Sequence, residues 1–280
     1  MKIPKNIEPL IDDGVVDEVL RQLKGGKEAT VYLVRCGSEL RCAKVYKKAN
    51  NRSFRHATEY MEGRKVKNSR RGRAMHKGSR YGREEQESSW QNAEVDALYV
   101  LAAAGVRVPK AFGFYDGVLL MEVVLDADDN IAPRLADVSL EADLAVTYHN
   151  FLIGEVVRML CAGIIHGDLS EYNILLSGEG PVIIDLPQAV SAAGNNQAAR
   201  LLDRDVENLK IYFGQFAPQL LASEYAAEIW KLYKEGKLKP DTQLSGKFKH
   251  STKAADVRGM LRELEEVREE HEEKRRKKDY

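Results

Sequence analysis

Short runs of apolar residues alternate with polar turns over the first part of the chain. The runs TVYLV (30–34) and CAKVY (42–46) flank the polar, glycine-containing stretch RCGSELR, and this pattern predicts two antiparallel strands joined by a hairpin. Two further strands are predicted within 106–124, around the turn signal YDG. The segment from Trp90 to Ala104 is helical in composition and ends at Gly105. The first half is therefore predicted to be a sheet with one helix.

The spacing of apolar residues becomes helical after Ser139. It predicts a buried helix that ends at Gly163, with an apolar face formed by Leu144, Phe151, Leu152, Val156, Met159 and Leu160. The runs ILL (174–176) and VIID (182–185) predict short strands, and further helices are predicted over 199–216 and 224–236. The tail, 260–280, loses its apolar residues and changes from acidic to basic, so we expect a solvated or fraying helix there.

The composition is that of a globular protein, and 280 residues suffice for one large domain or for two lobes that share an interface. The three cysteines are odd in number and form no CxxC pair, which argues against a disulfide framework or a zinc knuckle. The N-terminus has acids and a proline where a signal peptide needs an apolar run, and the most apolar long stretch, 144–165, carries charged residues. We therefore predict a cytoplasmic protein with no membrane partner.

A basic insert lies between Gly63 and Arg83. It holds nine Lys and Arg residues and no Asp or Glu, although the whole chain has a formal net charge of zero. Because it has so few aliphatic residues, we expect disorder in the free protein. Its single sign of charge indicates a polyanionic partner, which would be RNA or a ribosomal particle, and an acidic protein substrate is the rival partner.

Two glycines and a lysine of the first predicted sheet are residue types that bind phosphate groups in many proteins. Gly25 and Gly26 precede a strand and would let backbone N–H groups approach phosphate oxygens, although a plain tight turn has the same pattern. Alternation predicts that Lys44 faces the same side as Cys42 and Tyr46, where burying its charge would need an anionic partner. The alternative is an exposed lysine in an edge strand.

Three acids and one asparagine complete the pattern. Glu94 lies on the predicted helix, and HGDLSEYN (166–173) places Asp168 and Asn173 five residues apart. Asp185 ends the aliphatic run VIID, a position that suits a metal ligand and equally a structural cap. The order of these features, from glycine hairpin and strand lysine to helix glutamate, H-x-D-x-x-x-x-N and strand-ending aspartate, matches the signature set of protein kinases.

These motifs resemble the RIO-type atypical protein kinases, over residues 10–235. GKEATVY (26–32), HGDLSEYN and IDLPQAV (184–190) are similar to that family's phosphate, catalytic and metal loops, and RDVENLKIYF (204–213) is also similar. Within the family, the chain resembles a bacterial-type member of the first RIO subgroup. The resemblance implies an α+β, two-lobed protein-kinase-like fold. Its parts would be a small antiparallel-sheet N-lobe (1–120) with a flexible insert (63–85), a lobe connector (121–124), a truncated, mostly helical C-lobe (125–250) and a charged tail (251–280).

The resemblance also implies ligands and residue roles. The chain would bind ATP and Mg2+, with Mn2+ as an alternative ion. Its catalytic residues would be Lys44, which bridges the α- and β-phosphates and pairs with Glu94, Asp168, which accepts or orients the hydroxyl proton, and Asp185. Asn173 and Asp185 would hold the metal, and Asp185 would itself become transiently phosphorylated. The other nucleotide contacts would come from the phosphate loop and the connector, namely Gly25, Gly26, Lys27, Ala29, Val31, Met121, Glu122 and Val123.

Several positions depart from ordinary protein kinases. Lys24 and Ala29 replace two glycines of the phosphate loop, Gly167 replaces the arginine that pairs with an activation-loop phosphate, and no A-P-E motif follows Asp185. We therefore expect activity without phosphorylation of a loop after Asp185.

The function predicted is an ATP- and Mg-dependent serine protein kinase that also phosphorylates itself and hydrolyses ATP. One alternative is a small-molecule phosphotransferase of the aminoglycoside or choline kind, since HGDL followed by Asn is also typical of those enzymes. Another is an assembly factor that binds RNA or a ribosomal particle and uses ATP hydrolysis as a switch.

Overall fold

The computed structural model describes residues 3–26, 28–47 and 93–248. The chain divides into two units, Met1–Lys247 and Phe248–Tyr280, and all the elements described below belong to the first. Lys27, the basic insert and the tail 251–280 lie outside the described residues, so the predictions made for them stay predictions.

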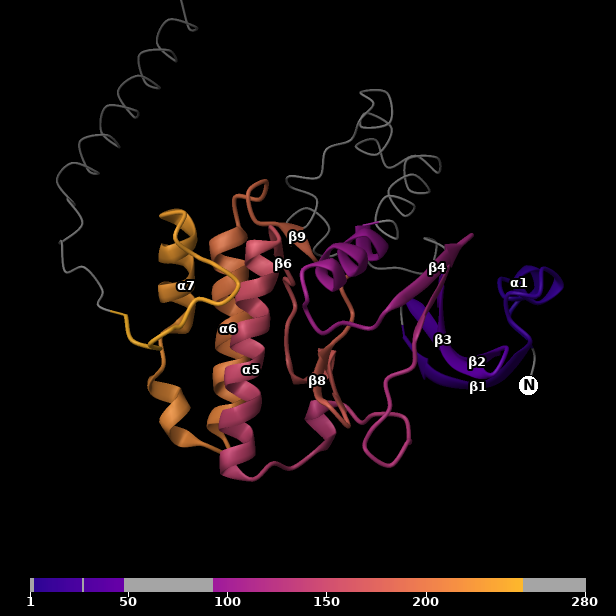
Figure 1. Ribbon diagram of the computed structural model, residues 1–280, viewed down its shortest axis with the longest axis horizontal. Helices are drawn as coiled ribbons and strands as arrows, with labels where there is room; N and C mark the ends of the chain where they lie inside the picture. The colour runs from indigo at the N-terminus through magenta and orange to yellow at the C-terminus, as the bar shows by residue number, and fades with distance from the viewer. Residues whose placement is uncertain (1–2, 27, 48–92, 249–280) are drawn as a thin grey trace, which may run out of the picture. The chain divides into compact units, whose positions relative to one another are not determined.

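A five-stranded antiparallel sheet forms the N-terminal part, with the strand order β1-β2-β3-β5-β4 (Figure 1). The strands are β1 (Glu18–Gly25), β2 (Ala29–Cys36), β3 (Glu39–Tyr46), β4 (Ala111–Tyr115) and β5 (Val118–Glu122). The two predicted hairpins are thus confirmed. The strand β1 was not predicted, because its register against β2 shifts twice and interrupts the apolar alternation.

Two helices accompany the sheet. The short helix α1 (Glu8–Asp12) buries Leu10 in a cluster with Val34, Val45 and Leu120, on one face of the sheet. The predicted helix before Gly105 is confirmed over its described part, 93–103. It ends there because Gly105 adopts a left-handed φ of 75°, which glycine adopts without a Cβ clash.

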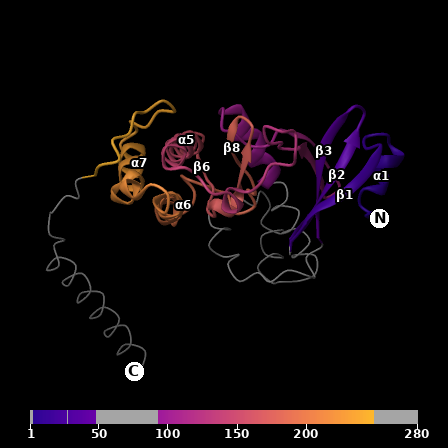
Figure 2. The same ribbon diagram turned by 90° about the horizontal axis from the view of Figure 1, so that it is seen from below.

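The C-terminal part is mostly helical, as predicted. Figure 2 shows its three main helices, α5 (Ala142–Cys161), α6 (Ala198–Gly214) and α7 (Tyr225–Lys234), grouped on the side away from β1–β3. Two short antiparallel strand pairs lie beside these helices: β6 (Ile164–Ile165) with β9 (Val190–Ser191), and the hairpin of β7 (Ile174–Ser177) with β8 (Gly180–Ile183). Asp168 lies between β6 and β7, and Asp185 lies between β8 and β9. Three 3-10 turns complete this part: η2 (Leu135–Asp137), η3 (Glu171–Asn173) and η4 (Pro218–Ala222).

The buried face of α5 differs in part from the prediction. Leu144 and Phe151 are 40% and 37% exposed, so placing them on the buried face was wrong. The buried stripe runs one position later, through Ala145, His149, Leu152, Val156 and Leu160. An apolar residue can also lie at the edge of the buried face of a helix. Helical spacing alone therefore does not show which of two adjacent rows of side chains faces the core.

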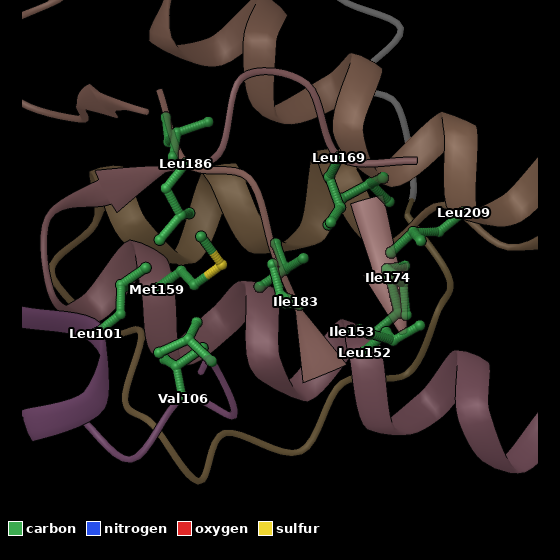
Figure 3. Packing of buried hydrophobic residues seen from close by; sticks show 14 of the residues in the cluster. Leu101, Val106, Leu152, Ile153, Met159, Leu169, Ile174, Ile183, Leu186 and Leu209 are labelled. Carbon is green, nitrogen blue, oxygen red and sulfur yellow. The ribbon is translucent and has the colours of Figure 1, made fainter. Parts of the chain in front are cut away.

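The core reaches directly under the two loops that carry Asp168 and Asp185. Figure 3 shows Leu169 and Leu186 turned into the same cluster as Met159 of α5 and Ile183 of β8. Leu169 follows Asp168 and Leu186 follows Asp185, and both leucines are almost fully buried. Each aspartate is therefore placed next to a side chain that the core holds in position.

Among the helices of the described ranges, none has the length and apolar character needed to cross a membrane.

Candidate active site

A cavity of about 780 Å³ lies between the sheet and the segments around β7 and β8. Its lining includes residues from β1, β2, β3, β5, the helix over 93–103 and the chain just after β8. Nine of the predicted site residues line it: Gly26, Ala29, Val31, Lys44, Glu94, Met121, Glu122, Val123 and Asp185. The structure thus brings together residues that the sequence spreads from 26 to 185.

Lys44 is the centre of an ion cluster in this cavity. Its Nζ lies 2.5 Å from Glu94 Oε1 and 2.9 Å from Asp185 Oδ1, and the Tyr46 hydroxyl donates to Glu94 Oε2 at 2.5 Å. Lys44 and Glu94 are both buried. Burial by itself would lower the pKa of the Lys44 ammonium, but Glu94 and then Asp185 outweigh burial and raise this pKa well above its usual value. Lys44 therefore stays charged.

Alternation along β3 explains why Lys44 points into the cavity. Ala43 and Val45 belong to the apolar cluster on the other face of the sheet, whereas Cys42, Lys44 and Tyr46 line the cavity. The predicted side for Lys44 is therefore the one observed. The anionic partners that its burial requires come from a helix and a loop far away in the sequence.

Asp185 occupies a strained position directly after β8. Its φ is +68°, a left-handed conformation that is uncommon outside glycine and turns the chain sharply. Ile184 before it donates its N–H to the Asn173 carbonyl at 2.9 Å, and Leu186 after it is buried. Although burial opposes the effect, Lys44 lowers the pKa of the Asp185 carboxyl, which keeps it ionised.

Asp168 and Asn173 lie together on the loop between β6 and β7. Asn173 Nδ2 donates to the Asp168 carbonyl oxygen at 2.9 Å and lies 3.5 Å from its Oδ2. Neither residue is among those lining the cavity, but His166 connects their loop to it, because its Nε2 lies 3.1 Å from the Ile184 carbonyl, next to Asp185. The Asp168 N–H donates to His166 Nδ1 at 3.3 Å, so Nδ1 is the acceptor and Nε2 is the donor to the Ile184 carbonyl. Partial burial raises the pKa of the Asp168 carboxyl.

Helix α6 holds this loop through contacts that sequence reasoning missed. The buried carboxylate of Asp205 accepts hydrogen bonds from the N–H groups of Gly167 at 2.8 Å and Leu169 at 2.9 Å. Asn208 Nδ2 donates to the Leu169 carbonyl at 2.9 Å, and Arg204 donates to the Gly167 carbonyl. The resemblance of the stretch RDVEN to the RIO-type kinases does not by itself give these residues a role. The sequence feature that could have indicated these contacts is the spacing of Arg204, Asp205 and Asn208, because these three positions share one helix face.

The connector after β5 is fixed by Glu122. Its carboxylate binds the Arg107 guanidinium through two hydrogen bonds of 2.8 and 3.1 Å, and its backbone N–H donates to the Lys110 carbonyl at 2.8 Å. Arg107 in turn donates its N–H to the buried Glu155 of α5 at 2.9 Å. The N–H of Glu122 is thus engaged within the protein, and a contact of its backbone with adenine would use the carbonyl oxygen. Val124, which sequence reasoning missed, also lines the cavity.

Asn173 and Asp185 suit a magnesium ion bound to a nucleotide. The described residues contain no group of three or more His, Cys, Asp or Glu side chains arranged to hold a metal. Mg2+ commonly takes one or two protein ligands and completes its shell with substrate phosphates and water. The Nδ2 group of Asn173 is turned to Asp168, so its Oδ1 atom is the one offered to a metal, and Asp185 adds a carboxylate. These donors fit magnesium that arrives with a nucleotide.

Comparison with known proteins identifies the family. The RIO domain model matches residues 30–226. The chain belongs to the RIO domain family. It is 35% identical over 208 residues to the RIO-type serine/threonine-protein kinase Rio1 of Haloferax volcanii, covering 74% of this chain and 67% of that protein. It is 31% identical to Rio1 of Methanocaldococcus jannaschii, covering 70% and 63%, and 28% identical to human serine/threonine-protein kinase RIO1, covering 73% and 34%.

The chain is thus a RIO-type serine/threonine-protein kinase similar to Rio1. The relatives named above are archaeal and human, and they do not support the prediction of a bacterial-type member. A crystal structure of the Rio2 kinase-ADP/Mg2+-phosphoaspartate complex from Chaetomium thermophilum matches with a TM-score of 0.54 at 22% identity, covering 77% of this chain and 65% of that one. This likeness confirms the predicted kinase-like fold.

Proposed function

We propose that this kinase transfers the γ-phosphate of ATP to serine hydroxyl groups of a protein substrate and of its own chain, with Mg2+ bound at Asn173 and Asp185. The observation that carries the proposal is the cluster of Lys44, Glu94 and Asp185 in a cavity large enough for a nucleotide. The loop with Asp168 is joined to the Asp185 segment through His166.

Each residue of the set has a role that follows from its charge and position. Lys44, held between Glu94 and Asp185, would neutralise the α- and β-phosphates. Asp168 would take the proton of the serine hydroxyl as its oxygen attacks the γ-phosphorus and ADP leaves. The raised pKa of Asp168 makes its carboxylate a better base than an aspartate with an ordinary pKa. Mg2+, when bound, would neutralise charge on the phosphates.

The remaining predictions on nucleotide contacts form part of the proposal. Val31 and Met121 would pack on the adenine, Glu122 and Val123 would offer backbone atoms to its edge, and Gly25, Gly26, Lys27 and Ala29 would form the phosphate loop. The lobe connector would span 121–124, between an N-lobe over 1–120 and a C-lobe over 125–250. A cytoplasmic location also stays a prediction.

Asp185 is proposed to accept a phosphate transiently. The Rio2 complex from Chaetomium thermophilum is a phosphoaspartate complex, and Asp185 is the ionised carboxylate that contacts Lys44 in the cavity of this chain. No phosphorylated activation loop would be needed, because Gly167 stands where ordinary kinases carry the arginine that reads such a phosphate.

A transfer assay with labelled ATP tests the function. The wild type, Asp168→Asn and Asp185→Asn would be incubated with protein fractions at several magnesium concentrations. Both variants should lose transfer by about 100-fold or more, because each removes a group that acts on the reacting atoms. Asp185→Asn should also weaken magnesium-dependent nucleotide binding. Near-normal turnover of Asp185→Asn at limiting magnesium would exclude its role as a metal ligand. Transfer of the label from ATP to an aminoglycoside or to choline, and not to protein, would support a small-molecule phosphotransferase.

An RNA or ribosomal partner is the second candidate, favoured by the nine basic residues of 63–83. Binding through phosphate contacts would weaken with salt, with a log–log slope of about −0.7 per contact for single strands. Replacing Arg70, Arg71 and Arg73 by Ala should flatten this slope and leave ATP hydrolysis unchanged. An unchanged slope would leave an acidic protein substrate as the partner of the insert.

A further inference from the structure

A row of three residues crosses the sheet and ends in a second lysine. Lys24 of β1 lies opposite Val31 of β2, and Val31 lies opposite Lys44 of β3. Residues directly opposite on neighbouring antiparallel strands point to the same face, and all three line the cavity. With strands about 4.8 Å apart, the backbones of Lys24 and Lys44 are about 10 Å apart. Figure 1 shows β1, β2 and β3 side by side in this order.

An irregularity in β1 turns Lys24 to this face. Gln22 pairs with Tyr32, which packs against the cluster on the opposite face of the sheet, whereas Lys24 pairs with Val31. In a regular strand Gln22 and Lys24 would point the same way. The register shift between them reverses Lys24, so that Leu23 and Lys24 both line the cavity although they are consecutive. Such irregularities commonly redirect a side chain beside an active site.

A third cation faces the same cavity from the segment before η2. Arg134 lines it together with Lys24 and Lys44. Burial lowers the pKa of the Lys24 ammonium, Arg134 and Lys44 lower it further, and Asp185 acts in the opposite direction. These mutual effects are expected only for charges that lie near one another.

Lys24 and Arg134 differ from Lys44 in their lack of a counter-ion. Lys44 has two ion pairs, whereas neither Lys24 nor Arg134 forms one with any residue in the part of the chain that the structure describes. Asp137 also lines the cavity, but it forms no ion pair with Arg134. Two cations that repel each other across a cavity are stabilised when an anion with several charges lies between them.

We propose that Lys24 and Arg134 bind the phosphate chain of the nucleotide, opposite Lys44, and set the preference of this cavity for phosphorylated nucleosides over the bare nucleoside. This inference rests on the proposed nucleotide site. Lys24 stands where a phosphate loop of ordinary kinases has its first glycine, so the chain would supply a side-chain ammonium where those loops supply close backbone approach.

Calorimetric titration of the full-length protein with adenosine, ADP and ATP, each with magnesium, tests the inference. Lys24→Met and Arg134→Met keep the length of the side-chain stem and remove the charge. Each should weaken ATP binding by about 10-fold, the size of one charge-assisted hydrogen bond, and leave adenosine binding within about twofold. Lys24→Arg should restore most of the ATP affinity, because a cation is again present.

Arg21→Met is the matched control, since Arg21 is a cation of the same strand and the same burial class as Lys24 but does not line the cavity. It should bind ATP as the wild type does. The inference would be overturned if Lys24→Met and Arg134→Met both bound ATP normally, or if both lost affinity for adenosine and for ATP equally. Either result would leave the proposed nucleotide site itself intact. If the wild type bound neither adenosine nor ATP, the proposed function itself would fail.

Discussion

The two halves of the candidate active site are held in place by different kinds of contact. Around Lys44, charged side chains hold one another, since Glu94 and Asp185 come from separate elements and meet at the ammonium group. Around Asp168, side chains of α6 hold the backbone, since Asp205 and Asn208 bond to main-chain groups of the loop. The geometry around Lys44 therefore depends on every charged side chain in the cluster. The loop that carries Asp168 is held by α6 without the help of the Asp168 carboxylate.

This difference predicts how each half responds to substitution. Removing a charge around Lys44 leaves its partners buried and unpaired, so activity and stability should change together. Replacing Asp168 itself should change activity alone, because the backbone of its loop keeps its contacts with α6. Substitutions at Lys44, Asp205 and Tyr46 test the two halves separately, in order of decreasing effect.

The largest effect is expected for Lys44→Met. The substitution leaves the buried Glu94 carboxylate and the Asp185 carboxylate without their shared cation. Phosphate transfer should fall by about 100-fold or more, and the free energy of unfolding should fall by about 3 kcal/mol, the usual cost of breaking a buried ion pair. Asp185 is half-exposed, so most of the lost stability is attributed to Glu94. Transfer assays and urea unfolding measure the two quantities.

The double variant Lys44→Met with Glu94→Gln is the control for this interpretation. Removing the buried charge as well as its partner should recover part of the lost stability but none of the lost activity. A double variant that is less stable than Lys44→Met would contradict the view that the unpaired Glu94 carboxylate causes the loss.

The second prediction concerns the pH dependence that Asp205 gives to the loop. Burial raises the pKa of Asp205 from its ordinary 3.8 to about 6, against the opposing effects of His166, two backbone N–H groups and Arg204. Between pH 3.8 and pH 6, Asp205 is protonated in the folded protein and ionised in the unfolded chain. The contribution of Asp205 to the free energy of unfolding is therefore fully present near pH 4 and is lost as the pH rises through 6. The stability advantage of the wild type over Asp205→Asn should therefore shrink by about 3 kcal/mol between pH 4 and pH 7.

Urea unfolding of both proteins across this pH range measures the difference. Asp203→Asn is the control, because it makes the same substitution at an exposed position of the same helix. An advantage of the wild type that stays constant from pH 4 to pH 7 would show that Asp205 is not the titrating group. Asp205→Asn should also slow phosphate transfer at pH 7 by about 10-fold, since the loop loses its charged acceptor.

The difference between the two halves of the site also explains which residues could be predicted from the sequence. Lys44, Asp168 and Asp185 stand in short motifs with recognisable spacing, and alternation along β3 was enough to place Lys44 on the correct face. Asp205 and Arg107 act on backbone or side-chain groups far away in the sequence, and no local pattern names their partners. Lys24 was named only as the replacement of a phosphate-loop glycine and not as a cavity residue, because no strand was predicted over 18–25, where β1 has two register shifts.

The smallest effect is expected for Tyr46→Phe, which removes one neutral donor from the Lys44 cluster and no charge. The Tyr46 hydroxyl donates to Glu94 Oε2, whereas Lys44 contacts Oε1, so the ion pair keeps its own oxygen. The buried Glu94 carboxylate loses the hydroxyl donor but keeps its ion pair with Lys44. The free energy of unfolding should therefore fall by about 1 kcal/mol relative to the wild type. Transfer should slow by about threefold, since Glu94 keeps Lys44 but is less firmly oriented. A loss as large as that of Lys44→Met would mean that the hydroxyl, and not the charge of Lys44, positions Glu94, and the contrast between a charge-held and a backbone-held half would then fail.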